Sequence, residues 1–192
     1  MSRVRWALHW LLALVSVLAF DATAALLHAN DRSLALTGSE VAYLRDPSGQ
    51  LGINDVAADK LATRFLSMSG RSSFGYTNDV IWLRITLQRE WQAPAEWWLE
   101  LTNPYINDLR MYSPGDGGFA VRQCGDRYPF VEREISYHHP VFNVSLLDAN
   151  PRTFYLRMQS DSSLSSELVL WRPLPCGTRP KSNCFGLAVY WA

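Results

Sequence analysis

The sequence predicts an all-β fold, an antiparallel jelly-roll β-sandwich with one short helix. Three observations lead to this prediction. From residue 74 onward, short runs rich in β-branched and aromatic residues alternate apolar and polar side chains, and a period of two is typical of half-buried strands. Turn-forming residues separate these runs at short intervals, as in sandwich folds. With 48% hydrophobic residues in a chain of 192, there are enough apolar side chains for a substantial core.

Residues 1–24 have the pattern of a secretory signal peptide. Two arginines precede an apolar run over residues 10–20, and Ala22-Thr23-Ala24 is a small-x-small cleavage site. Because Asp21 ends the run before the ~20 apolar residues that a spanning helix needs, we expect removal of the segment. We therefore predict that the mature chain begins near Ala25, outside the cytoplasm.

The part before residue 74 is expected to hold a lead-in and the helix. Residues 25–39 are the lead-in, residues 33–37 and 41–44 are short edge strands, and Asp46-Pro47-Ser48-Gly49 is a turn. A single short helix is expected at residues 55–66, because Val56, Leu61, Phe65 and Leu66 roughly share one face at helical spacing.

Seven further strands follow a turn at residues 74–79. They are expected at residues 80–87, 97–101, 109–112, 118–122, 141–147, 153–159 and 167–171. The stretch 160–166 reads as a turn. In each strand one set of alternate side chains is apolar and is assigned to the core: Ile81, Leu83, Ile85, Leu87, Trp97, Leu99, Leu101, Leu109, Met111, Phe142, Val144, Leu146, Phe154, Leu156 and Met158.

The opposite sets form the outer surface of the two sheets. They carry aromatic and polar side chains: Trp82, Arg84, Trp98, Glu100, Arg110, Tyr112, Tyr155, Arg157 and Gln159. Such a surface can bind a sugar by ring stacking with hydrogen bonds at the edge. The alternative is that each Trp and Arg packs against a neighbour. The sequence does not assign the strands to one outer face or the other.

Several segments resemble a known family in their order and spacing. They are Asp46 to Gly49, Gly75-Tyr76-Thr77 with Trp82-Leu83-Arg84, residues 99–104, residues 125–130 with Arg133, and residues 155–160. Over roughly residues 40–172 the chain resembles the type-2 extracellular sensor domain of bacterial seven-transmembrane receptors with diverse intracellular signalling modules, 7TMR-DISM.

This resemblance implies a periplasmic jelly roll, similar to carbohydrate-binding modules, that senses a ligand. In a full-length receptor it is attached to the inner membrane through seven helices and coupled to a cytoplasmic diguanylate cyclase or histidine kinase. The expected ligand is a carbohydrate or a small polar or anionic molecule, and the expected contact residues are Trp82, Arg84, Arg133, Arg157, Trp98 and Tyr112. Residues 173–192 depart from the family pattern and are expected to be an atypical, proline-rich tail outside the sandwich core; the alternative is that they are the truncated start of the membrane region.

Other function classes are disfavoured. The 18 basic and 18 acidic residues balance without a basic cluster, which excludes a nucleic-acid partner. Neither a metal nor a cofactor is expected, and a glycan-acting enzyme is disfavoured because Glu132 and Glu134 lie in a polar run without groups to desolvate them. A protein-interaction or homodimer module, with Trp98 exposed beside Tyr112, is the main alternative.

Cysteine usage is compatible with an exported protein but leaves the pairing open. Cys124, Cys176 and Cys184 make an odd count, and their spacing matches no zinc motif. A bond between Cys176 and Cys184 would close a short loop and leave Cys124 free.

Overall fold

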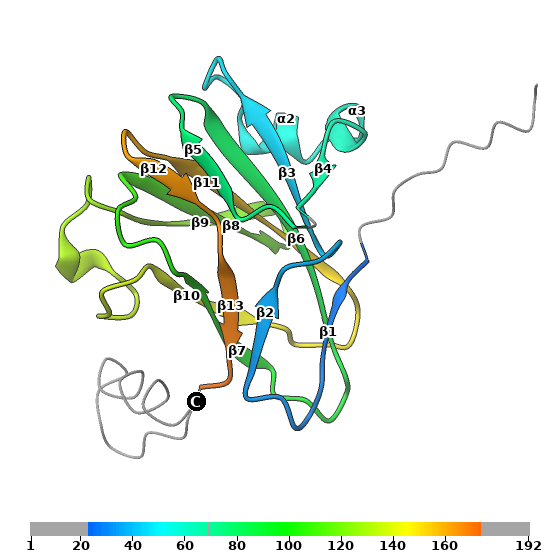
Figure 1. Cartoon of the computed structure of the whole chain (residues 1–192). Helices are drawn as coiled ribbons and strands as arrows, with labels where there is room; N and C mark the ends of the chain where they lie inside the picture. The colour runs from blue at the N-terminus through cyan, green and yellow to red at the C-terminus, as the bar shows by residue number, and fades with distance from the viewer. Residues whose placement is uncertain (1–22, 69, 174–192) are drawn as a thin grey trace, which may run out of the picture.

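The computed structural model describes residues 23–68 and 70–173, and it contains two β-sheets packed face to face (Figure 1). The larger sheet has the strand order β4-β3-β6-β11-β8-β9, and β1 runs parallel to the end of β6. Its strands are β1 (Ala25–Leu27), β3 (Val41–Asp46), β4 (Leu66–Ser67), β6 (Val80–Arg89), β8 (Asp108–Gly115), β9 (Gly118–Cys124) and β11 (Arg152–Gln159).

The smaller sheet has the strand order β10-β7-β13-β2 and is antiparallel throughout. Its strands are β2 (Ser33–Leu36), β7 (Glu96–Leu101), β10 (Val141–Ser145) and β13 (Leu168–Trp171). A separate pair joins β5 (Ser73–Tyr76) to β12 (Ser163–Ser165). The predicted all-β sandwich is therefore confirmed, whereas its jelly-roll form stays a prediction.

The core lies between the two sheets and contains the side chains that the alternation assigned to it. Ile81 and Leu83 of β6 are fully buried there, together with Trp97 of β7 and Leu170 of β13. Burying apolar area stabilises a fold by roughly 25 cal/mol per Å². This two-sheet interface is the main source of stability.

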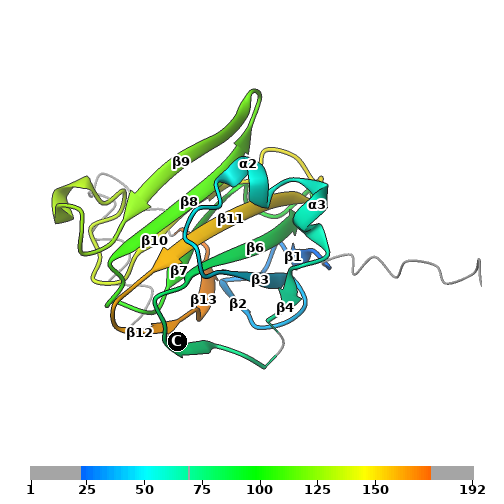
Figure 2. The ribbon, with the colours of Figure 1, turned by 90° about the horizontal axis from the view of Figure 1, so that it is seen from above.

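The outer face of the larger sheet is covered by two helical turns. These are α2 (Ile53–Val56) and α3 (Asp59–Ala62), and both lie across the strands of this sheet (Figure 2). The single helix expected at residues 55–66 is thus divided, because Ala58 has an extended conformation with ψ of 144°. The helical conformation ends at Ala62, and Leu66, which was also expected on the apolar face, is 57% exposed and lies in β4. The other three side chains expected on that face do pack on the sheet. Val56, Leu61 and Phe65 are all buried against it.

Four short strands were not expected from the sequence. β5 overlaps the turn predicted at residues 74–79, and β12 lies within the predicted turn 160–166. Both pair through their backbones with few apolar side chains, so period-two alternation does not reveal them. β1 and β4 are only three and two residues long. β1 and β2 also bring the lead-in, residues 25–39, into the two sheets.

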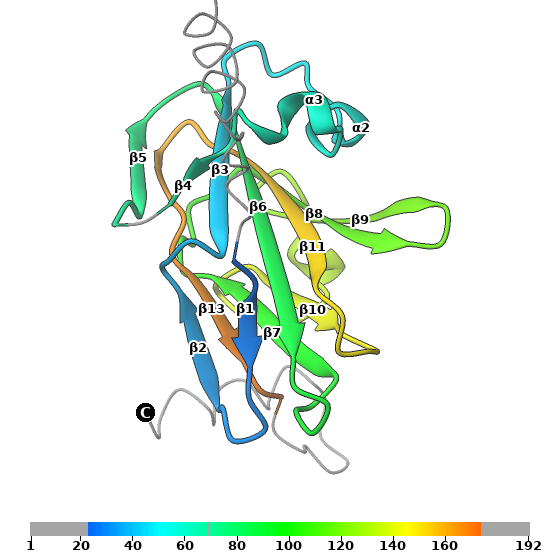
Figure 3. The same cartoon turned by 90° about the vertical axis from the view of Figure 1, so that its right-hand side faces the viewer.

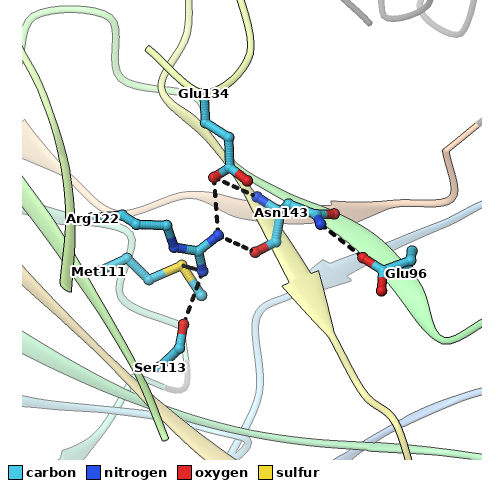
Figure 4. Close-up of polar contacts among 6 residues, drawn as sticks. All are labelled: Glu96, Met111, Ser113, Arg122, Glu134 and Asn143. Carbon is cyan, nitrogen blue, oxygen red and sulfur yellow. Dashed lines mark hydrogen bonds and ion pairs between the residues drawn. The ribbon is translucent and has the colours of Figure 1, made fainter. Parts of the chain in front are cut away.

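A polar cluster joins the two sheets along the edge between β9 and β10 (Figure 4). The guanidinium of Arg122 donates to the carboxylate of Glu134 at 2.9 Å, to the carbonyl of Asn143 at 2.6 Å and to the hydroxyl of Ser113 at 2.8 Å. Asn143 in turn donates to Glu96 at 2.7 Å. Since Ser113 belongs to β8 and Asn143 to β10, one side chain ties the larger sheet to the smaller one.

Some predictions fall outside the described residues. They concern the signal peptide, the tail beyond Pro173, and the pairing of Cys176 with Cys184. Cys124 is buried and forms no disulfide within the part of the chain that is described. Among the helices of residues 23–68 and 70–173, none has the length and apolar character needed to cross a bilayer.

Candidate ligand-binding face

The outer face of the larger sheet gathers four of the six predicted contact residues. The antiparallel register places Arg157 of β11 between Trp82 of β6 and Arg110 of β8. The next row on the same face places Tyr155 between Arg84 and Tyr112. Trp82, Arg84, Tyr112 and Arg157 therefore lie in two adjacent rows across three neighbouring strands, which Figure 2 shows side by side.

A buried carboxylate organises the polar part of this face. Asp108, at the start of β8, is only 3% exposed. Arg110 binds it in bidentate fashion, with Nε to Oδ1 at 3.0 Å and Nη2 to Oδ2 at 2.9 Å. Arg157 donates Nη1 to Oδ2 at 3.1 Å, and the Tyr128 hydroxyl donates to Oδ1 at 3.0 Å. We call Asp108, Arg110, Tyr128 and Arg157 the Asp108 cluster.

The Asp108 cluster has an excess of positive charge. One carboxylate faces two guanidiniums, so one positive charge has no acidic counterpart within the cluster. The hydrogen bonds that Arg110 donates to Asp108 raise the pKa of Arg110, and burial raises the pKa of Tyr128, so both groups keep their protons at neutral pH. Only Nη1 of Arg157 bonds to Asp108, and its other two nitrogens form no hydrogen bond within the described residues. A small anion can bind to such an arrangement.

Trp82 is not exposed, and the expectation that it lies open on this face is wrong. Its exposed fraction is 0%, because Val56, Leu61 and Phe65 of the helical region pack over it and its neighbours. Tyr112 lies against it at a ring-centroid distance of 5.5 Å. A ligand cannot stack on Trp82 in this conformation. Its Nε1 has no hydrogen-bond partner among the described residues.

Arg84 lies next to the helices and is partly buried. Its guanidinium lies 4.6 Å from the ring centre of Phe65, and its Nε has no hydrogen-bond partner in the described part of the chain. Burial raises the pKa of the neighbouring Tyr155, while the charge of Arg84 opposes this rise. Arg84 thus contributes a third guanidinium to the same face.

Trp98 lies on the outer face of the smaller sheet, and Arg133 lies in the loop between β9 and β10. Trp98 is 5% exposed and packs with Ile135 and Val141. Arg133 donates to the carbonyls of Tyr137 at 2.7 Å and His138 at 3.1 Å. The expectation of an exposed Trp98 beside Tyr112 is therefore wrong, because the loop between β9 and β10 covers Trp98. The six residues do not form one site.

Comparison with known families decides the assignment. Residues 38–172 match the family described as 7TMR-DISM extracellular 2. The chain belongs to this family. The match confirms the resemblance found in the sequence and gives the chain the role of an extracellular sensor domain of a membrane receptor family. No curated protein matched the chain.

This 7TMR-DISM domain also holds a buried acid that the sequence did not single out as a site. Glu100 of β7 is buried, accepts a hydrogen bond from the indole of Trp171 at 2.5 Å and lies 2.5 Å from His139 Nδ1. Burial and then His139 lower the pKa of His138, while Glu100 opposes them. Within residues 23–68 and 70–173, no group of three or more His, Cys, Asp or Glu side chains is arranged to hold a metal ion.

An open pocket of about 420 Å³ adjoins the same face of the 7TMR-DISM domain. It lies between α2, the tip of the β8–β9 hairpin and the loop before β11, and it reaches the Arg84 row at Tyr155. Its lining residues are Ala57, Pro114, Gly115, Asp116, Phe119, Pro151, Arg152, Thr153 and Tyr155. The volume suits a small ligand.

Asp108, Arg110 and Tyr128 were missed as site residues. Arg110 is in the predicted outer set, so period two alone identifies its face. Asp108 and Tyr128 had no comparable signal, because their contact joins residues 20 positions apart along the chain.

Proposed function

We propose that this chain is the ligand-sensing domain of a periplasmic receptor and that its ligand is a small anion or an anionic sugar. Family membership supports the sensor role. The excess of positive charge in the Asp108 cluster is the observation that supports an anionic ligand. Arg110 and Arg157 bind its charged group, Arg84 adds a third positive charge, and Tyr112 supplies a ring edge.

The arginine side chains suit this role because of where their charges lie. Asp108 fixes both guanidiniums, so little side-chain entropy is lost when a ligand binds. Because Asp108 occupies Nε and Nη2 of Arg110, the pair of nitrogens that can bind a ligand in bidentate fashion is Nε and Nη2 of Arg157. A bidentate arginine pair selects carboxylate or phosphate over a neutral hydroxyl. In the complete receptor, binding at this face changes the state of the membrane helices, and a cyclase or kinase module reports it.

Thermal shift measurements on the full chain test the proposal. Galacturonate, galactose and inorganic phosphate are titrated at constant ionic strength, so galactose controls for sugar contacts without the charge. We expect the melting temperature to rise with galacturonate or phosphate concentration and to respond little to galactose, because binding to the folded state stabilises it by mass action.

Two variants locate the effect. Arg110→Gln removes one exposed guanidinium while Arg157 and Tyr128 still bond to Asp108, and we expect affinity for the anion to fall about tenfold or more, since a charge-assisted hydrogen bond contributes roughly 1.5–3 kcal/mol. Arg32→Gln, on an exposed loop far from this face, is the matched control. An equal response of both variants, or no response to either anion, would contradict the proposal.

A further inference from the structure

One end of the sandwich is built from four segments that are distant in sequence. It comprises residues 28–32, 89–95, 146–151 and 171–173, and we call it the base; it lies at the lower end of the molecule in Figure 3. Glu90 contacts His28 at 2.8 Å, Leu146 donates its N–H to Ala95, and Arg172 donates its N–H to Arg32. The four segments therefore form one continuous surface.

A single buried arginine fixes two loops of the base. Arg89 donates from Nε to the carbonyl of Leu146 at 2.6 Å and from Nη2 to that of Leu147 at 3.1 Å. Its Nη1 donates to the carbonyls of Glu90, Trp91 and Ala93 at 2.8–3.1 Å. Burying a guanidinium is costly unless its donors are satisfied. Here five carbonyls satisfy them and hold both loops in a defined conformation.

The side chains that these two loops present are apolar and open to solvent. Trp91 is 73% exposed and Leu147 is 69% exposed. The carbonyls of both residues bond to the same guanidinium, so their backbones are held close together. The Trp91 ring also lies 5.5 Å from the Arg89 guanidinium. The fold thus displays two apolar side chains side by side on a rigid support.

The charges of the base permit contact with anionic groups. Its acids each have a hydrogen-bond partner: Asp31 accepts from the His28 N–H, Glu90 contacts the His28 ring, and Asp148 pairs with Arg152. Arg32 and Arg172 add positive charge at the same end. The base therefore has no excess of negative charge to repel an anionic surface.

We propose that the base rests on a lipid bilayer surface, with Trp91 and Leu147 entering the interfacial layer. Three observations support a lipid surface as the partner. The family consists of extracellular domains of membrane receptors. The last described residue, Pro173, belongs to the base. Trp is the side chain that membrane–water interfaces favour, whereas two side chains are far too few for a protein interface, which buries about 1,200 Å² or more.

Contact between the base and the bilayer gives the base a role in signalling. A domain that rests on the membrane at one end has its orientation fixed relative to the membrane helices. The inference does not depend on the ligand face, because none of the residues in the Asp108 cluster belongs to the base.

Hydrogen–deuterium exchange on the full chain tests this contact. The amides of residues 91–92 and 147–149 are measured with and without vesicles of phosphatidylethanolamine and phosphatidylglycerol. We expect their exchange to slow about threefold or more on vesicles, while the β8–β9 hairpin tip at residues 116–117 is unchanged. No slowing at the base in the wild-type chain would overturn the proposal.

Variants connect the protection to the two side chains. In Trp91→Ser combined with Leu147→Ser, we expect the protection by vesicles to disappear, since both side chains are exposed and contribute little to folding. Tyr76→Ser, which removes a side chain that is 84% exposed and lies outside the base, is the matched control and should keep the protection. Protection that survives in the double variant overturns the proposal. The proposal is also overturned if protection appears without vesicles as the protein concentration rises, because the base then binds a second copy of the chain.

Discussion

Replacing Arg89 with Met should destabilise the domain strongly. Two of the five carbonyls that Arg89 bonds to, those of Leu146 and Ala93, are buried and would lose their donor. Leaving a buried acceptor unsatisfied costs about 1–3 kcal/mol. The other three carbonyls are partly exposed, and water can replace the guanidinium there. We therefore expect the free energy of unfolding to fall by about 2–6 kcal/mol.

Urea denaturation and thermal melting measure this loss. For a domain of this size, roughly 3 kcal/mol corresponds to a melting temperature lower by about 10 °C. Arg152→Met is the matched control, because Arg152 lies at the same end but pairs with Asp148 at the surface, and such pairs contribute at most about 1 kcal/mol. A loss below about 1 kcal/mol for Arg89→Met, or equal losses for the two variants, would refute the idea that Arg89 holds the loops.

Three further outcomes are expected. Trp82→Ala should cost roughly 3–5 kcal/mol in urea denaturation, because it empties a fully buried position beneath the helices. Burial raises the pKa of Asp46, but bonds from Ser48, Leu51 and Gly49 outweigh it and leave the pKa below its ordinary value. The stability from these bonds is present above the unfolded pKa and is lost as pH falls through the folded pKa, so Asp46→Asn should flatten the acid limb of a stability–pH curve. Burial raises the pKa of Cys124, so iodoacetamide should label it only after unfolding, as peptide mass spectrometry can measure.

The sequence was sufficient to predict which side of each main strand faces the core. Ile81, Leu83, Ile85 and Leu87 alternate without exception, and all four are buried between the sheets. Alternation is a local property, and the pleat of a strand converts it directly into two faces. The fold class follows from the same pattern, since many such strands separated by turns can bury their apolar faces only by packing two sheets together.

The candidate face could be predicted only in part, because its geometry depends on pairing between distant strands. That Arg84 and Arg157 share a face with Tyr112 follows from the register of β6, β11 and β8, which no single segment determines. The burial of Trp82 has a related cause. The apolar side of residues 53–65 is removed from water by packing on the outer face of the larger sheet, and this packing buries Trp82.

Two arginines break the alternation of their strands, because each occupies a position of the apolar set. Arg89 has the same parity as Ile81 to Leu87 and is 7% exposed at the end of β6, whereas Arg122 has the same parity as the buried Cys124 and its side chain is 32% exposed near the end of β9. A guanidinium in that position must find acceptors, because an unpaired buried charge is too costly. Each of them finds backbone carbonyls of neighbouring segments, five for Arg89 and that of Asn143 for Arg122. Arg84 and Arg157 have the opposite parity, so they are not required to close the fold in this way. An arginine that replaces an apolar residue in the alternation near a strand end therefore predicts that its guanidinium holds a loop or joins two strands through backbone carbonyls. An arginine among the alternating polar residues is the better candidate for binding a ligand.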